Sequence, residues 1–168
     1  MKCAIMQPTY LPWSGYFNLI YKTDIFIFLD DTQFSKGSWH NRNRILINSK
    51  EKWITVPIKK HKLSTNLDEI LIVDQKKWKE SHINLIYQAY YKHPFFKNIE
   101  ELIKFINDIE IKNLSQLNID LITFISKKLS FKIKFLKSSE TKSKKKRTEK
   151  LIELLEKYNV AEYFSPKG

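Results

Sequence analysis

The segment that most constrains the fold is DIFIFLD at residues 24–30, where five consecutive apolar residues stand between two aspartates. An unbroken apolar run of this length is typical of a strand that is buried on both faces, as in a parallel sheet. Residues 4–6 predict a shorter strand before it, and residues 15–22 between the two have the apolar spacing of a helix. A strand, a helix and a buried strand in this order predict a βαβ unit and therefore a mainly parallel sheet.

The middle of the chain predicts a hairpin followed by helices. Residues 44–48 and 52–58 are strand-like and are separated by a short polar segment, which predicts a β-hairpin. Residues 67–73 predict a further strand. A mostly helical insertion at about residues 74–129 follows, with amphipathic patterns at 74–92, 97–108 and 114–129.

The last third of the chain returns to an alternation of strand and helix. The patterns predict a strand at 131–137, a helix at 148–158 and a short strand at 161–164. We therefore predict a single α/β domain over residues 1–168. It has three layers and a mainly parallel, Rossmann-like sheet, to which the β-hairpin and the helical insertion are added.

The composition argues against several classes of protein. The net charge of +12 would suit a nucleic-acid-binding module. However, only three of the 30 basic residues are arginine, the residue that makes bidentate contacts with phosphate and guanine. We therefore regard most of the charge as solvated surface and nucleic acid as an unfavoured partner. A single cysteine, apolar runs too short to span a bilayer and an N-terminus without a signal-peptide pattern lead us to expect a cytoplasmic protein.

Three polar loops follow predicted strands, at residues 7–15, 30–44 and 138–148. In open α/β sheets, ligands bind beyond the carboxyl ends of the strands. We therefore expect the three loops to converge on one site.

The first loop, QPTYLPWSG, combines stacking and hydrogen-bonding residues. Gln7 can donate and accept hydrogen bonds, and Tyr10 and Trp13 can stack on a flat ligand. Gly15 would permit close approach at the start of a helix, where free amide groups attract anions. The alternative is a turn stiffened by prolines, whose aromatic rings belong to the core.

The second loop carries two sets of charged residues. Asp30 and Asp31 end a buried strand, where a carboxylate pair could bind Mg²⁺ or steer a hydroxyl group. Arg42 and Arg44 share one face of an extended segment and could clamp a phosphate or carboxylate. The alternative is a solvent-facing edge with ion pairs of little energetic value. Further candidates in this loop are Ser35, Lys36, Trp39, Asn41 and Asn43.

The third loop places Ser138 and Ser139 before a helix that begins near Arg147 and Thr148. Hydroxyl groups, helix amide groups and a cation together suit a phosphate. The alternative is a capped helix preceded by a flexible run of lysines.

The four histidines show no metal-binding spacing, so we predict no metal site from them. His82 lies on the same face of the predicted helix at 74–92 as Trp78. A hydrogen-bonded histidine in the core is one interpretation, and a general base is the other.

These segments together resemble the WbqC-like proteins of bacteria. The family motif QPxYLPWxGYF is matched by residues 7–17, and the motif DDxQFSKxxWxNRNRI by residues 30–45, which include Gln33. Later similarity lies in YYKHPFF and in KRTEKLIELL, so the resemblance covers nearly the whole chain. Family members usually continue beyond the position of YFSPKG, and we therefore expect a C-terminal segment of the family to be absent here.

The resemblance implies a role in the synthesis of bacterial O-antigen, a part of lipopolysaccharide, and of related surface polysaccharides. It favours a transferase or sugar-modifying enzyme with a phosphate-bearing substrate, such as a nucleotide or nucleotide sugar. The alternatives are a basic nucleic-acid-binding module and a non-catalytic assembly protein of the same pathway. The layout is also similar to that of nucleotidylyltransferases, but the two histidines in the first turn of that family are missing here.

Each candidate residue has a role in the enzyme interpretation. The arginines hold phosphate groups, Trp13 or Trp39 stacks on a base or sugar, and a carboxylate or histidine handles a proton. The predicted catalytic residues are Asp30, Asp31 and His82. The predicted substrate-binding residues are Gln7, Tyr10, Trp13, Gly15, Gln33, Ser35, Lys36, Trp39, Asn41, Arg42, Asn43, Arg44, Ser138, Ser139, Arg147 and Thr148.

Overall fold

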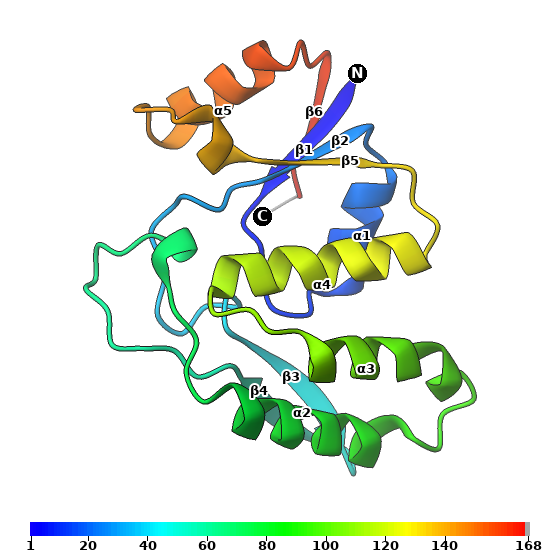
Figure 1. The fold of residues 1–168 in the computed structure, drawn as a ribbon. Helices are drawn as coiled ribbons and strands as arrows, with labels where there is room; N and C mark the ends of the chain where they lie inside the picture. Colours follow the sequence, from blue (N-terminus) through cyan, green and yellow to red (C-terminus); the bar gives the residue numbers. More distant parts are fainter. Residues whose placement is uncertain (167–168) are drawn as a thin grey trace.

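A parallel sheet of four strands organises the first and last parts of the chain (Figure 1). The computed structural model describes residues 1–166. Strand order is β5-β2-β1-β6, and every pairing in the sheet is parallel. This confirms the predicted mainly parallel α/β fold. The strands are β1 (Lys2–Met6), β2 (Ile25–Phe28), β5 (Lys134–Lys137) and β6 (Glu162–Phe164).

Helices cover both faces of the sheet, and the sequence of β2 explains how one strand serves both layers. All four residues of β2 are buried. Phe26 and Phe28 pack in one apolar cluster, whereas Ile25 and Ile27 pack in the cluster on the opposite face. An unbroken apolar run is therefore what this central strand requires. The covering helices are α1 (Ser14–Tyr21) and α4 (Leu114–Lys128) on the phenylalanine face and α5 (Arg147–Lys157) on the isoleucine face.

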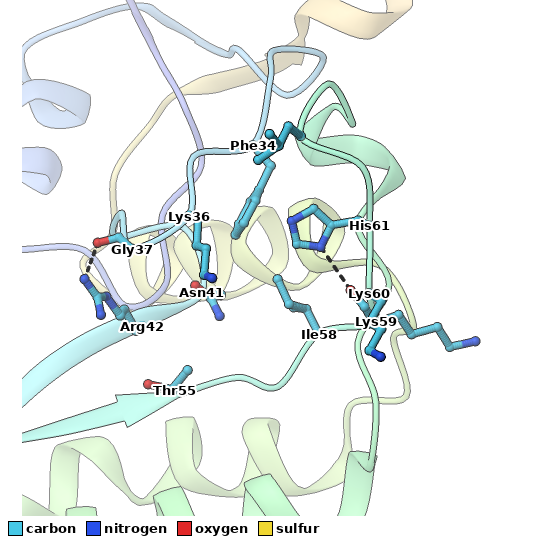
Figure 2. A pocket seen from close by; sticks show the side chains of 11 residues that line it. Phe34, Lys36, Gly37, Asn41, Arg42, Thr55, Ile58, Lys59, Lys60 and His61 are labelled. Atoms are coloured by element: carbon cyan, nitrogen blue, oxygen red, sulfur yellow. Dashed lines mark hydrogen bonds between the residues drawn. The ribbon is translucent and has the colours of Figure 1, made fainter.

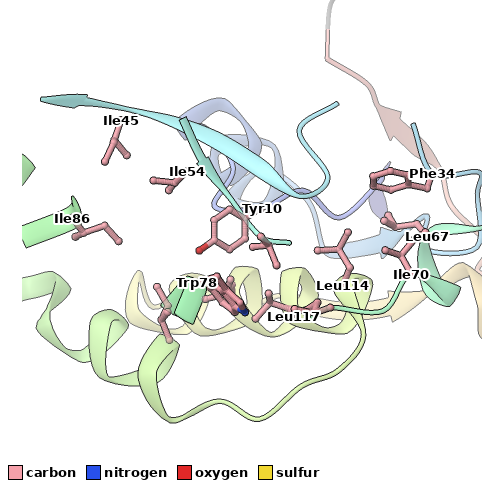
Figure 3. Close-up of a cluster of buried hydrophobic side chains, with 14 of the residues drawn as sticks. Tyr10, Phe34, Ile45, Ile54, Leu67, Ile70, Trp78, Ile86, Leu114 and Leu117 are labelled. Atoms are coloured by element: carbon pink, nitrogen blue, oxygen red, sulfur yellow. The ribbon is translucent and has the colours of Figure 1, made fainter. Parts of the chain in front are cut away.

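A second apolar core lies between an antiparallel hairpin and helices, with Tyr10 and Trp78 inside it (Figure 3). Helix α4 belongs to both cores, because Leu117 packs in this one and Ile119 packs against the sheet. The same helix thus joins the helical segment to the parallel sheet. The new elements of this core are the strands β3 (Arg42–Ile47) and β4 (Lys50–Thr55) and the helices α2 (Gln75–Tyr90) and α3 (Glu100–Asp108).

The prediction of a strand at 67–73 is wrong. The segment begins with a 3₁₀ helix, η1 (Leu67–Glu69), and its later residues make only single bridges. The reason is local, because Asn66 and Glu69 form a capping box in which the Asn66 amide donates to Glu69 Oε2 at 3.0 Å. Such reciprocal hydrogen bonds stabilise a helical turn at the expense of an extended chain.

Strand β5 begins later than the predicted start at residue 131. The amide of Phe131 donates to the carbonyl of Ser126 at 3.0 Å, which extends the end of α4. Two further 3₁₀ turns, η2 (Phe96–Ile99) and η3 (Ser138–Thr141), precede α3 and follow β5. Within residues 1–166, no helix has both the length and the apolar character that crossing a bilayer requires.

Candidate functional site

The first two loops meet beyond the carboxyl end of β1, as expected from the sheet. The amide of Tyr10 donates to the carbonyl of Trp39 at 3.0 Å. Gln7 bridges the loops with its side chain, donating to Thr32 Oγ1 at 2.7 Å and contacting His40 Nε2 through Oε1 at 3.1 Å. Burial lowers the pKa of His40, so its ring is neutral in this contact. Gln7 therefore fixes the loops to each other.

The third loop meets the end of β2 through a buried polar cluster, which we call the acidic clamp: Asp30, Asp31, Ser138, Ser139 and Lys150. Asp30 is 4% exposed and accepts hydrogen bonds from the Ser139 amide at 3.0 Å and the Ser139 hydroxyl at 2.7 Å. The hydroxyl of Ser138 contacts both carboxylates. Lys150, from α5, forms an ion pair with Asp31 at 2.5 Å. The clamp joins the ends of β2 and β5 to the helix that covers them.

The acidic clamp does not fit the predicted Mg²⁺ or proton transfer. Lys150 already neutralises Asp31, and the oxygens of Asp30 are occupied as acceptors. Burial, together with the negative charges of Asp30 and Asp31, raises the pKa of the neighbouring Asp68. In the described part of the chain, no group of three or more His, Cys, Asp or Glu side chains is placed to hold a metal ion. The polar groups of the clamp are thus paired with one another.

His82 and Tyr10 lie next to each other in the second core. The Tyr10 ring is fully buried and His82 is 3% exposed. His82 Nε2 contacts the Thr55 carbonyl at 3.2 Å, and Nδ1 contacts the Tyr10 hydroxyl at 2.9 Å. A carbonyl only accepts, so we assign the proton to Nε2 and the acceptor role to Nδ1. Burial lowers the pKa of His82 to about 4, which suits a neutral core histidine. The geometry therefore supports neither a general base at His82 nor a stacking role for Tyr10.

Gly15 does allow a close approach, but the approaching group belongs to the chain itself. A Cβ atom at this position would lie 1.7 Å from Cζ3 of Trp13. The six-membered part of the Trp13 indole therefore lies directly against the glycine at the start of α1. Trp13 is nevertheless 64% exposed, so its other face remains open.

Arginines and tryptophans form a stacked row on the hairpin. The guanidinium carbon of Arg42 lies 4.3 Å from the ring centroid of Trp53, and that of Arg44 lies 5.5 Å from the same centroid and 5.3 Å from that of Trp39. The two indole rings are 5.4 Å apart. Both arginines thus share one face of β3, as predicted. They flank Trp53, and Arg44 pairs with Glu51 at 2.6 Å.

A cavity of about 610 Å³ lies beside Arg42, and we call it the basic pocket (Figure 2). The Phe34 and His61 rings meet edge to face at one end, with centroids 5.0 Å apart. Arg42 donates to the Gly37 carbonyl across the rim. Five basic or imidazole side chains line the pocket, and none of its lining residues carries a carboxylate. The lining residues are Phe34, Lys36, Gly37, Asn41, Arg42, Thr55, Ile58, Lys59, Lys60, His61 and Leu63.

A second cavity, of about 570 Å³, lies between the first loop and the hairpin, and we call it the aromatic cleft. It contains two of the exposed tryptophans and the Arg44–Glu51 ion pair. Its walls are thus apolar and aromatic, with a charged rim. The lining residues are Met6, Thr9, Pro12, Trp13, Tyr16, Trp39, Asn43, Arg44 and Glu51.

Comparison with known proteins assigns the chain to a family. The chain matches the model of the WbqC-like protein family over residues 7–168. It belongs to the WbqC-like family. A Mycobacterium tuberculosis protein described as "Uncharacterized protein Rv1507c" is 34% identical over 166 residues, which is 98% of this chain and 71% of that relative. No solved structure matches the chain significantly.

Several polar residues of the two WbqC-like motifs use their side chains to hydrogen-bond backbone carbonyl groups of the loops. Asn41 donates to the Val56 carbonyl at 3.0 Å, and Gln33 to the Leu63 carbonyl at 2.7 Å. The side-chain amide of Asn43 donates to the Tyr10 carbonyl at 3.1 Å. Ser35 is exposed beside the basic pocket but is not among its lining residues. These side chains account for much of the loop geometry.

The third loop is only partly joined to the other two. Ser138 and Ser139 enter the acidic clamp, whereas Arg147 and Thr148 are exposed at the start of α5 and line neither cavity. The predicted convergence therefore holds for the strand ends but not for the helix start.

Sequence reasoning missed the basic residues after the hairpin. Lys59, Lys60 and His61 follow β4 and line the basic pocket, but they come after an antiparallel strand. The expectation that ligands bind beyond the carboxyl ends of parallel strands therefore did not indicate these residues. The signal that could have found them is the local run KKHK at residues 59–62, which begins two residues after Pro57.

Proposed function

We propose that this member of the WbqC-like family is an enzyme of bacterial surface-polysaccharide synthesis that acts on a phosphate-bearing substrate, such as a nucleotide or nucleotide sugar. The proposed reaction class is group transfer to, or modification of, the activated sugar. Family membership supports the context. The observation that carries the proposal is the cation-rich, carboxylate-free lining of the basic pocket.

The charges of the basic pocket are well suited to an anion. Lys36, Lys59 and Lys60 are exposed, so their ammonium groups can reach a ligand. Arg42 is held at the rim by the Gly37 carbonyl and by stacking on Trp53, so its guanidinium is pre-positioned. Without a carboxylate among the lining residues, these positive charges add to a local field that attracts phosphate groups.

The size and chemistry of the basic pocket fit a small molecule. Its volume of about 610 Å³ lies within the range of ligand pockets in enzymes. Cations that surround a phosphate stabilise the negative charge that develops on it during transfer or departure. His61 is the lining residue that we propose for proton transfer. Its Nδ1 donates to the Lys59 carbonyl at 3.0 Å, so Nε2 is the ring nitrogen that is left to contact a ligand.

The test measures binding of nucleoside diphosphates and nucleotide sugars by calorimetry and by thermal shift. We expect the wild type to bind at least one of them, and the double variant Lys59→Ala, Lys60→Ala to lose about tenfold or more in affinity. The matched control is Lys76→Ala, Lys77→Ala, which removes the same charge from exposed positions on α2. The control variant should bind like the wild type.

Three results would count against the proposal. One is the lack of any shift with the whole nucleotide set at millimolar concentration. Another is equal loss in the double variant and its control, which would reflect net charge alone. The third is tight, strongly salt-dependent binding of single-stranded RNA without nucleotide binding, which would favour the nucleic-acid alternative.

A further inference from the structure

The aromatic cleft has properties that the basic pocket lacks, and it suggests a second ligand. We infer that the aromatic cleft binds the pyranose ring of a sugar, and that it does so without any contribution from phosphate. This inference goes beyond the proposed function, because it requires neither a phosphate group nor a reaction. It would hold even if the basic pocket bound no nucleotide.

The first observation is the exposure of large indole rings in one cavity. Trp13 is 64% exposed and Trp39 is 45% exposed, and both line the cleft. Tryptophan is highly buried on average, so two exposed indoles in one cavity call for an explanation. A flat apolar partner that covers them removes this surface from water. The carbon–hydrogen face of a pyranose is such a partner.

The second observation is that both rings are held in place before any ligand arrives. Gly15 supports one face of Trp13, which leaves the opposite face for a ligand. Trp53 lies 5.4 Å from Trp39, and Arg44 lies 5.3 Å from the same ring. A ligand that stacks on these indoles therefore loses little affinity to the ordering of side chains.

The third observation concerns the polar rim, which suits hydroxyl groups. Arg44 supplies donors and Glu51 supplies acceptors, and their charged atoms lie 2.6 Å apart. A sugar hydroxyl both donates and accepts, so it can bridge such a pair without a change in net charge. Asn43 is already occupied by the Tyr10 carbonyl and by the amide of Arg44. The exposed ion pair is therefore the main polar feature that a ligand meets.

The same features argue against other occupants. The guanidinium of Arg44 already lies over the Trp39 and Trp53 rings and would repel a quaternary ammonium ion. Glu51 offsets the positive charge of Arg44, so the rim has no excess of cations for a phosphate. A nucleobase would gain stacking, but its edge needs several hydrogen-bond partners in one plane. The cleft offers one charged pair at its rim.

The experiment uses uncharged probes, namely the methyl glycosides of glucose, galactose, mannose and N-acetylglucosamine. Saturation-transfer NMR and tryptophan fluorescence report binding to the full chain. We expect at least one glycoside to bind at millimolar concentration. Trp13→Ala and Glu51→Gln should each weaken binding by about tenfold, the effect of losing one stacked ring or one charged hydrogen bond.

The controls separate this site from the basic pocket. Lys59 and Lys60 do not line the aromatic cleft, so Lys59→Ala, Lys60→Ala should bind the glycoside like the wild type. Circular dichroism and thermal melting check that each variant is folded, and Glu51→Gln keeps the size of the side chain.

Three outcomes would overturn the inference. They are the absence of binding by any glycoside, unchanged binding in folded Trp13→Ala, and a Trp13-dependent response to nucleosides but to no glycoside. Failure of nucleotide binding with intact glycoside binding would remove the proposed function and leave the sugar site standing.

Discussion

The acidic clamp and the basic pocket both contain charged residues next to strand ends. They differ in whether other protein groups pair with those charges. In the clamp, Asp30 is 4% exposed and Lys150 is 6% exposed, and protein groups occupy their polar atoms. In the pocket, Lys59 and Lys60 are exposed, and no lining carboxylate neutralises them. The contrast teaches that a charged motif at a sheet edge is a candidate binding site only if its partners are not already within the protein.

The largest expected effect on stability comes from replacing Lys150 of the acidic clamp, and Lys59 of the basic pocket is the comparison. Lys150→Ala leaves Asp31 without its cation in a site where the two side chains are 7% and 16% exposed. Loss of one partner of a buried ion pair destabilises a protein by about 3 kcal/mol or more. Lys59→Ala should change the free energy of unfolding by no more than about 0.5 kcal/mol, as is usual for an exposed residue.

Urea unfolding of the two lysine variants and the wild type at neutral pH measures this difference. Similar losses of stability in Lys150→Ala and Lys59→Ala would break the division between a structural and a ligand-binding set of charges.

A second expected effect is the pH dependence of stability that the buried His82 causes. Burial lowers the pKa of His82 from 6.5 to about 4, so between these values the unfolded chain binds more protons than the folded one. The contribution of neutral His82 is thus complete above pH 6.5 and is lost as the pH falls to about 4. The shift corresponds to about 3 kcal/mol of stability over this range.

The free energy of unfolding as a function of pH checks this effect. His82→Gln should flatten the pH dependence between pH 6.5 and 4, although its hydrogen bonds to Tyr10 and Thr55 change and its overall stability falls. If His82→Gln keeps the wild-type slope, His82 is not the buried neutral group that the structure indicates.

The third expected effect is at Gly15, where two influences on stability oppose each other. Alanine favours the helix by about 1 kcal/mol over glycine, but its Cβ would collide with the Trp13 ring. Trp13 is 64% exposed, so displacement of its ring by the new Cβ removes little burial, and the net change should stay within about 1 kcal/mol. The displaced indole should nevertheless change its fluorescence and reduce glycoside binding.

A double-variant comparison sharpens the result at Gly15. In a Trp13→Ala background the collision is gone, so Gly15→Ala should be more stabilising there than in the wild type. Equal effects in the two backgrounds would show that the indole does not lie over Gly15.

The sequence patterns predicted the main layers because those layers depend on local periodicity. The apolar run at 24–30 became β2, buried on both faces, and the helix spacing at 15–22 became α1. The strand predicted at 67–73 failed because a capping box between Asn66 and Glu69 stabilises a turn there. Hydrophobic periodicity cannot show which of two local hydrogen-bond arrangements has the lower energy.

The candidate residues were harder to predict than the layers. The motifs indicated the right loops, and Trp13, Trp39, Arg42 and Arg44 do line cavities. Tyr10 gave no local sign that its ring would be fully buried in the second core. Trp13, the other aromatic residue of the loop at 7–15, is 64% exposed, so an aromatic side chain in this loop did not by itself decide its role.

The sequence by itself determined the order of strands and helices, the family and the loops that lie at the sheet edge, because short-range patterns and motifs carry that information. Only the tertiary structure decided which charged groups neutralise one another and which remain open to a ligand. Ser138 meets Asp30 across 108 positions of sequence, whereas none of the residues that line the basic pocket carries a carboxylate. Such pairing depends on how distant segments pack, and the energy of a buried charge depends on that packing.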